Sequence, residues 1–178
     1  MSEITKEQAL ESFNAQAEEQ NTQQLELDKK ILTNIEKFGH TYMGIFSDAS
    51  IARPAFIYTV GLHLSGLPEI IMSGNLDQAE MHGVISNLAG YWLQEKRPIF
   101  GDYPDFIKLS DEKSAPISVV KVDPDFANDN YLFIVKRLYP DAKYEVAQLY
   151  WPDINCKLPF DDDYSQDEAY VQDILPLV

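Results

Sequence analysis

The sequence changes its periodicity after Gly39. Residues 4–38 contain no Pro or Gly and are rich in Glu, Gln, Leu, Lys and Ala, a composition that favours helix. Because residues 14–24 offer only two alanines as apolar side chains, we expect two helices, with a break near Thr22 as N-cap. Gly39 stands where a left-handed residue would end the second helix. Residues 1–38 are therefore predicted to form an N-terminal helical arm.

From His40 onward, short stretches alternate apolar and polar side chains, as strands do. Three of them, "HTYMGIFSD", "AFIYTVGL" and "PEIIMSG", follow one another and favour an antiparallel meander. Further along we expect a helix over 75–97, a loop at "FGDYPDFI", a strand over 116–122, a helix over 129–139 and a strand in "YEVAQLYWPD". Strands and helices mix without regular βαβ alternation, so the predicted class is α+β. Residues 39–160 would form a mostly antiparallel sheet packed by helices.

The charge balance narrows the classes of partner. The chain has 14 Lys plus Arg against 29 Asp plus Glu, a net charge of −15, which disfavours direct contact with nucleic-acid phosphates or an anionic membrane surface. The stretch 151–178 holds seven acidic residues against Lys157 alone. Residues 161–178 are predicted to be an acidic C-terminal tail, either a solvated segment or a docking strip for a basic protein.

The cysteine and histidine content indicates neither disulfides nor a metal centre. A single cysteine, Cys156, rules out an internal disulfide framework. Glu80 and His82 would lie about 200° apart around a helix, so they do not form a ligating face, and we expect no metal and no cofactor. No run of 18 apolar residues and no secretory signal pattern is present, which predicts a cytoplasmic protein.

Polar residues interrupt the apolar strand "AFIYTVGL" and are the first candidates for a binding site. In a regular strand Thr59, Gly61 and His63 share one face, opposite Tyr58. That face either borders a pocket or is a partly exposed sheet surface. Gly61 marks either a structural bulge or the close approach of a backbone or ligand.

Glu69 is the carboxylate that most invites a functional interpretation, because it follows Pro68 at the start of an apolar strand. It either pairs with Arg53 or Lys121 at the surface, or faces a pocket near His63 as an acid or general base.

A second group of candidates ends the last predicted strand: Gln148, Trp151 and Asp153. These residues either fill the core and shape a turn, or stack against a planar ligand and hydrogen-bond it.

Three elements, taken in order, resemble the DUF4262 family: tyrosine-threonine-x-glycine-leucine, proline-glutamate and glutamine-x-x-tryptophan-x-aspartate. They are carried by Tyr58, Thr59, Gly61, Leu62, Pro68, Glu69, Gln148, Trp151 and Asp153. The resemblance covers about residues 36–160 and implies a small bacterial or phage-encoded domain without an assigned function. Where the family has a glycine-tryptophan pair before its first strand, this chain has Gly39 and His40, so no role of that aromatic residue is carried over.

Two functions are compatible with these residues. The first is a non-enzymatic domain that binds a small ligand near Thr59, His63 and Glu69, or a basic protein such as a phage or host defence factor through its acidic surface. The second is a small hydrolase-like or nucleotide-processing enzyme with Glu69 and His63 as acid and base. In the binding domain, the N-terminal helices are expected to mediate self-association or partner contact.

Overall fold

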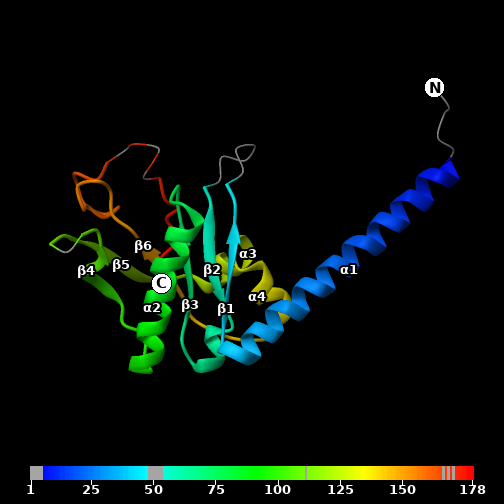
Figure 1. The fold of residues 1–178 in the computed structure, drawn as a ribbon, viewed down its shortest axis with the longest axis horizontal. Helices are drawn as coiled ribbons and strands as arrows, with labels where there is room; N and C mark the ends of the chain where they lie inside the picture. The colour runs from blue at the N-terminus through cyan, green and yellow to red at the C-terminus, as the bar shows by residue number, and fades with distance from the viewer. Residues whose placement is uncertain (1–5, 48–53, 111, 166, 168, 170) are drawn as a thin grey trace. The chain divides into compact units, whose positions relative to one another are not determined.

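The chain divides into two compact units, Met1–Phe38 and Gly39–Val178. The computed structural model describes residues 6–47, 54–110, 112–165, 167, 169 and 171–178 (Figure 1). In this part of the chain no helix is both apolar enough and long enough to cross a bilayer.

The described part of the N-terminal unit is a single helix, α1 (Lys6–Phe38), so the expected break near Thr22 is wrong. The hydroxyl of Thr22 donates to the carbonyl of Glu18 at 2.9 Å, which satisfies it inside the helix without a cap. Gly39 follows with φ +82°, the left-handed conformation predicted for the residue that ends the helix.

The second unit is built on one six-stranded sheet in the order β1-β2-β3-β6-β5-β4. The strands are β1 (Thr41–Ile45), β2 (Phe56–Val60), β3 (Glu69–Ser73), β4 (Gly101–Lys108), β5 (Ser114–Val122) and β6 (Val146–Tyr150). All neighbours are antiparallel except β3 and β6, which run parallel. The predicted α+β class and the opening meander are thereby confirmed.

Helices cover both faces of this sheet (Figure 1). Helix α2 (Gln78–Glu95) packs on one face, where Ile85 and Leu88 join the apolar core with Ile57 of β2. Burying each of these aliphatic side chains contributes roughly 2 kcal/mol. The two short helices α3 (Pro124–Asn130) and α4 (Phe133–Leu138) lie on the other face, where the amide of Ile134 donates to the hydroxyl of Tyr58 at 3.4 Å. Because both faces are covered, every residue of β2, β3 and β6 is buried.

Two predicted elements differ from the structure. The expected loop "FGDYPDFI" lies almost entirely in strand β4, which tolerates Pro104 because it is an edge strand with a register shift between Tyr103 and Ile107. The stretch 129–139, expected to be one helix, holds the last residues of α3 and all of α4. Helix α3 begins earlier and is capped by Asp123, whose carboxylate accepts the amides of Asp125 and Phe126.

Candidate functional site

Strands β2 and β3 separate at the end of β2, and polar side chains fill the gap. Their ladder is regular from the pair Phe56 and Ser73 to the pair Tyr58 and Ile71. Beyond it, the hydroxyl of Thr59 replaces a backbone partner and accepts the amide of Ile70 at 2.8 Å. The same hydroxyl donates to the Glu69 carboxylate, so a side-chain contact takes over where the backbone pairing ends.

Gly61 turns the chain out of β2 into a short 3₁₀ helix, η2 (Leu62–Ser65). Its φ of +98° lies in the left-handed region, which disfavours any residue with a Cβ. This turn brings two amides onto one carboxylate oxygen, because Oε1 of Glu69 accepts the N–H of Gly61 at 2.9 Å and that of His63 at 3.2 Å.

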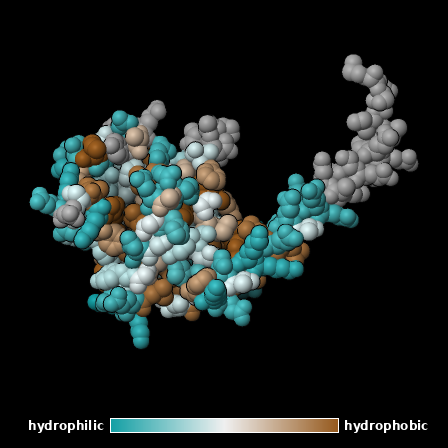
Figure 2. Space-filling model, in the orientation of Figure 1, coloured by the Kyte–Doolittle hydropathy of each residue, from teal (hydrophilic) through white to brown (hydrophobic). Residues whose placement is uncertain are grey.

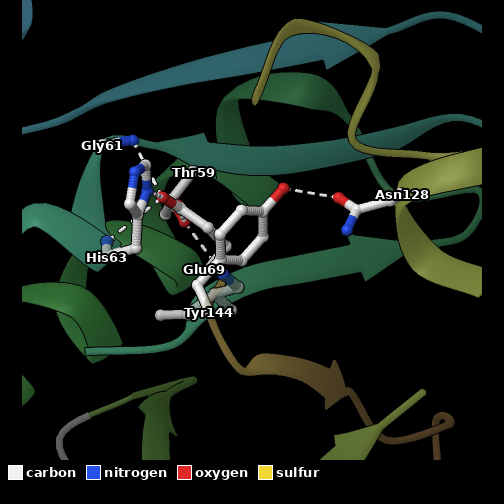
Figure 3. Close-up of polar contacts among 7 residues, drawn as sticks. Thr59, Gly61, His63, Glu69, Asn128 and Tyr144 are labelled. Carbon is white, nitrogen blue, oxygen red and sulfur yellow. Dashed lines mark hydrogen bonds and ion pairs between the residues drawn. The ribbon is translucent and has the colours of Figure 1, made fainter. Parts of the chain in front are cut away.

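Glu69 is fully buried, and its carboxylate is the centre of the cluster (Figure 3). Besides Thr59 and the two amides it contacts Nδ1 of His63, at 2.5 Å from Oε1. The surface ion pair considered from the sequence is wrong for Lys121, which instead pairs with Glu145 at 2.5 Å; Arg53 lies outside the described residues. Four donors on one carboxylate offset the cost of burying its charge.

The ring of His63 has two very different nitrogens. Nδ1 meets Glu69, which fixes the orientation of the imidazole. Nε2 is buried and has no hydrogen-bond partner among the described residues, although only 7% of the side chain is exposed. Two aromatic rings hold the imidazole, Tyr139 edge-on at 4.8 Å between centroids and Tyr144 tilted at 4.9 Å.

A recess of about 200 Å³ adjoins this histidine. It is lined by His63, Gly66, Leu67, Pro68, Lys143, Tyr144 and Glu145. The Tyr144 hydroxyl donates to Oδ1 of Asn128 at 2.5 Å, as Figure 3 shows. Burial, and then the charge of Glu69, raise the pKa of Tyr144 above its ordinary value, so this phenol stays protonated.

The other predicted candidates form a separate group that holds the C-terminal segment. Oε1 of Gln148 accepts the Tyr150 hydroxyl at 2.8 Å and the Leu175 amide at 3.0 Å, while its Nε2 donates to the carbonyl of Asp173. The indole of Trp151 donates to the carbonyl of Ser73 at 2.8 Å. Part of the predicted acidic tail is therefore attached to the sheet by hydrogen bonds.

Asp153 shapes the loop after β6. Its carboxylate accepts the amides of Asn155, Lys157 and Ser165 at 2.8–2.9 Å. Burial by itself would raise the pKa of Asp153, but these three donors hold it below the ordinary value, so the group stays ionised. The turn-forming alternative considered from the sequence matches these contacts.

The structure thus divides the eight sequence candidates into a group of four, a group of three and Tyr58 by itself. Thr59, Gly61, His63 and Glu69 come together, and Gln148, Trp151 and Asp153 do not join them. Tyr58 lies on the α3–α4 face, where burial raises its pKa to about 12.

Lys143 and Tyr144 belong to the recess but were not found from the sequence. They precede β6, whose parallel pairing with β3 sets Val146 opposite Glu69. Only a prediction of that pairing would have placed them beside the carboxylate. Among the described residues no group of three or more His, Cys, Asp or Glu side chains is placed to hold a metal ion.

Comparison with known proteins adds a family but no activity. No curated protein matches the chain, and no solved structure does. The sequence profile of a domain of unknown function (DUF4262) matches residues 34–165, well over half of the chain and all eight candidate positions. As the three sequence elements indicated, the chain belongs to the DUF4262 family.

Proposed function

We propose that this domain binds a small anion in the recess beside His63. The observation that carries the proposal is that Nε2 of His63, a residue that lines the recess, is a buried polar atom without a hydrogen-bond partner among the described residues. Leaving such an atom unpaired costs about 1–3 kcal/mol, which a ligand would recover. A volume of about 200 Å³ suits an ion or a few-atom fragment better than a drug-sized molecule.

The charges at the recess favour a negative ligand. Lys143 is exposed and has no ion pair in the described part of the chain, whereas Glu145, also at the recess, is paired with Lys121. A second proton on His63 would give an imidazolium neutralised by Glu69, with an Nε2–H free to donate. An anion could then accept from both Nε2 and the Lys143 ammonium.

The test is calorimetric titration of the full chain with inorganic phosphate and with acetate. His63→Asn keeps an atom near the Nδ1 position that meets Glu69 but removes Nε2, so we expect at least one anion to bind the natural chain and to bind this variant about tenfold more weakly. His82→Asn, on the exposed side of α2, is the matched control and should bind as the natural chain does. Equal affinity of the His63 and His82 variants, or no binding of either anion to the natural chain, would refute the proposal.

A general-base reaction is the second candidate, favoured by the 2.5 Å contact between Glu69 and Nδ1 of His63. A carboxylate that orients an imidazole in this way leaves Nε2 to take a proton from a bound water. The described residues that line the recess include no Ser, Thr or Cys, so water is the nucleophile to consider. The candidate predicts turnover of a p-nitrophenyl phosphate or acetate probe that Glu69→Gln abolishes, and absence of turnover leaves the binding function.

For the remaining surfaces we propose a protein partner in the cytoplasm, either a second copy through α1 or a basic protein. Leu25 and Leu32 support self-association, because they are 57% and 45% exposed and lie one heptad apart on α1. Replacing both by Gln should lower the mass measured by light scattering from oligomer to monomer. A natural chain that is monomeric at high concentration would exclude a role of α1 in self-association.

A further inference from the structure

A second cavity lies between α2, the β4–β5 hairpin and the loop after β6. Its volume is about 640 Å³, within the range of pockets that hold small organic molecules. Its apolar lining includes Leu76 and Val84 of the α2 region, Phe106 and Ile107 of β4, and Trp151. Figure 2 shows apolar side chains among hydrophilic ones on the face where Figure 1 places α2 and the hairpin.

Gly83 borders this cavity from the interior of helix α2. Glycine destabilises a helix interior relative to alanine, so Gly83 must provide something else that offsets this cost. Packing within the domain does not supply this offset, because a Cβ added at Gly83 would meet no atom within 4 Å. What the missing side chain does provide is open space on the cavity side of the helix.

The acidic groups at the cavity already have favourable electrostatic partners, whereas the basic groups have none that the described residues supply. Glu80 lies in the first turn of α2, where the helix dipole stabilises a negative charge, and Asp153 accepts three backbone amides. Lys108 and Lys113, near the tip of the hairpin, are exposed and have no ion pair among the described residues. In a chain of net charge −15, two ammonium groups that have no ion pair in the described part of the chain lie beside this apolar cavity.

From this combination we propose that the cavity binds an amphipathic monoanion. The apolar body of the ligand lies against Val84, Phe106 and Trp151, over the space left by Gly83, and its carboxylate or equivalent head group lies at Lys108 and Lys113. The site is independent of the anion site proposed at His63, because the two cavities share no lining residue.

Decanoate, below its micelle concentration, is a suitable probe, with decanol and decylamine as neutral and cationic analogues of equal chain length. Titration calorimetry on the full chain should show decanoate binding most tightly of the three. The double variant Lys108→Gln/Lys113→Gln should weaken decanoate about tenfold and leave decanol unchanged, as expected for two partly exposed ion pairs.

The space at Gly83 has a matched control on the same helix. Gly83→Leu fills the cavity and should weaken both decanoate and decanol at least about tenfold. Gly90→Leu adds the same side chain two turns later, at a position where an added Cβ also meets no atom within 4 Å but which does not line this cavity. This variant should bind as the natural chain does. Melting curves confirm that both variants fold.

A readout on the natural chain keeps the proposal testable if Gly83→Leu does not fold. Cys156 is the single cysteine and lines the cavity, so bound decanoate should slow its modification by a thiol reagent at least threefold, which corresponds to occupancy of about two thirds or more. No protection of Cys156, equal binding of decanoate and decanol, tighter binding of decylamine, or undiminished binding by a folded Gly83→Leu chain would each overturn the proposal.

Discussion

The buried polar atoms of Gln148 all have hydrogen-bond partners elsewhere in the chain. Beside Glu69, by contrast, one buried atom, Nε2 of His63, has no hydrogen-bond partner among the described residues. Both groups lie on β-strands of one sheet, and both were candidates for function. The difference lies in what their hydrogen bonds accomplish. The Gln148 group holds the C-terminal segment against the sheet by hydrogen bonds. The Glu69 group orients the imidazole of His63 through Nδ1 and leaves Nε2 without a hydrogen-bond partner among the described residues. An unmet hydrogen-bonding atom is therefore a better guide to a site than a buried polar residue as such.

We expect the largest loss of unfolding free energy at Glu69, because removing its carboxylate leaves several buried donors without an acceptor. Glu69→Ala leaves the Thr59 hydroxyl, the Gly61 amide and Nδ1 of His63 buried without their acceptor, and should lower the free energy of unfolding by about 3–5 kcal/mol. Urea denaturation measures it. Glu145→Ala, at a carboxylate that is 52% exposed, should cost less than about 1 kcal/mol. Similar losses for both variants would mean that burial of the Glu69 carboxylate is not what the cluster depends on.

High pH should destabilise the domain through Tyr58. Burial raises the pKa of this phenol to about 12 from an ordinary value of 10.0, so the unfolded chain loses the proton first. The stabilisation is complete below pH 10 and is lost as the pH rises toward 12, by about 2–3 kcal/mol in all. Tyr58→Phe should flatten the dependence of unfolding free energy on pH in this window; an unchanged slope would contradict the assignment.

At Gln148 the expected loss is smaller but has a second signature. Gln148→Leu deprives the Leu175 amide and the Tyr150 hydroxyl of their acceptor and should cost about 2 kcal/mol. It should also make the residues from Gln172 onward more sensitive to proteases. His63→Asn, which retains a contact with Glu69, should leave that sensitivity unchanged and cost under about 1 kcal/mol. If the two variants released the C-terminal segment equally, the distinction between the groups would fail.

The smallest pair of effects compares two glycines and should differ in sign. Gly61→Ala places a Cβ at φ +98° and should destabilise by about 1–2 kcal/mol, while also disturbing the amide that Glu69 accepts. Gly90→Ala, inside α2 and facing open space, should stabilise by up to about 1 kcal/mol. Thermal denaturation of both variants gives the signs directly. A stabilising Gly61→Ala would show that the turn into η2 does not require a left-handed residue.

Periodicity and turn residues were sufficient to predict much of the fold. Alternating side chains predicted β2 and β3, and the helical composition before Pro98 predicted α2. Two expectations were wrong. The Gly-Asp-Tyr-Pro-Asp stretch was expected to be a loop, but it belongs to an edge strand, which accepts Pro104. The scarcity of apolar side chains in residues 14–24 suggested a break, but these residues lie inside one helix, where the Thr22 hydroxyl bonds a backbone carbonyl.

The candidate site was predictable only where it is local in sequence. Thr59, Gly61, His63 and Glu69 lie within one hairpin, so their spacing already suggested a common place. Lys143 and Tyr144 reach them through the parallel pairing of β3 with β6, a contact that no local pattern encodes. Gln148 also lies on a strand next to β3, but its amide group bonds the C-terminal segment, a contact that no local pattern encodes either.

The hydrogen bonds of the last residues have a practical consequence for where the domain can be cut. Gln172 bonds both the amide and the carbonyl of Trp151, the Asp173 amide meets Ser73, and Leu175 is 1% exposed. The family match ends at residue 165, before any of these contacts. Truncating the chain after residue 165 would remove hydrogen bonds that the C-terminal segment makes to β3, β6 and β5. It would also expose apolar surface that promotes aggregation. In this chain the segment that matches the family, residues 34–165, is therefore shorter than the segment that forms the stable domain.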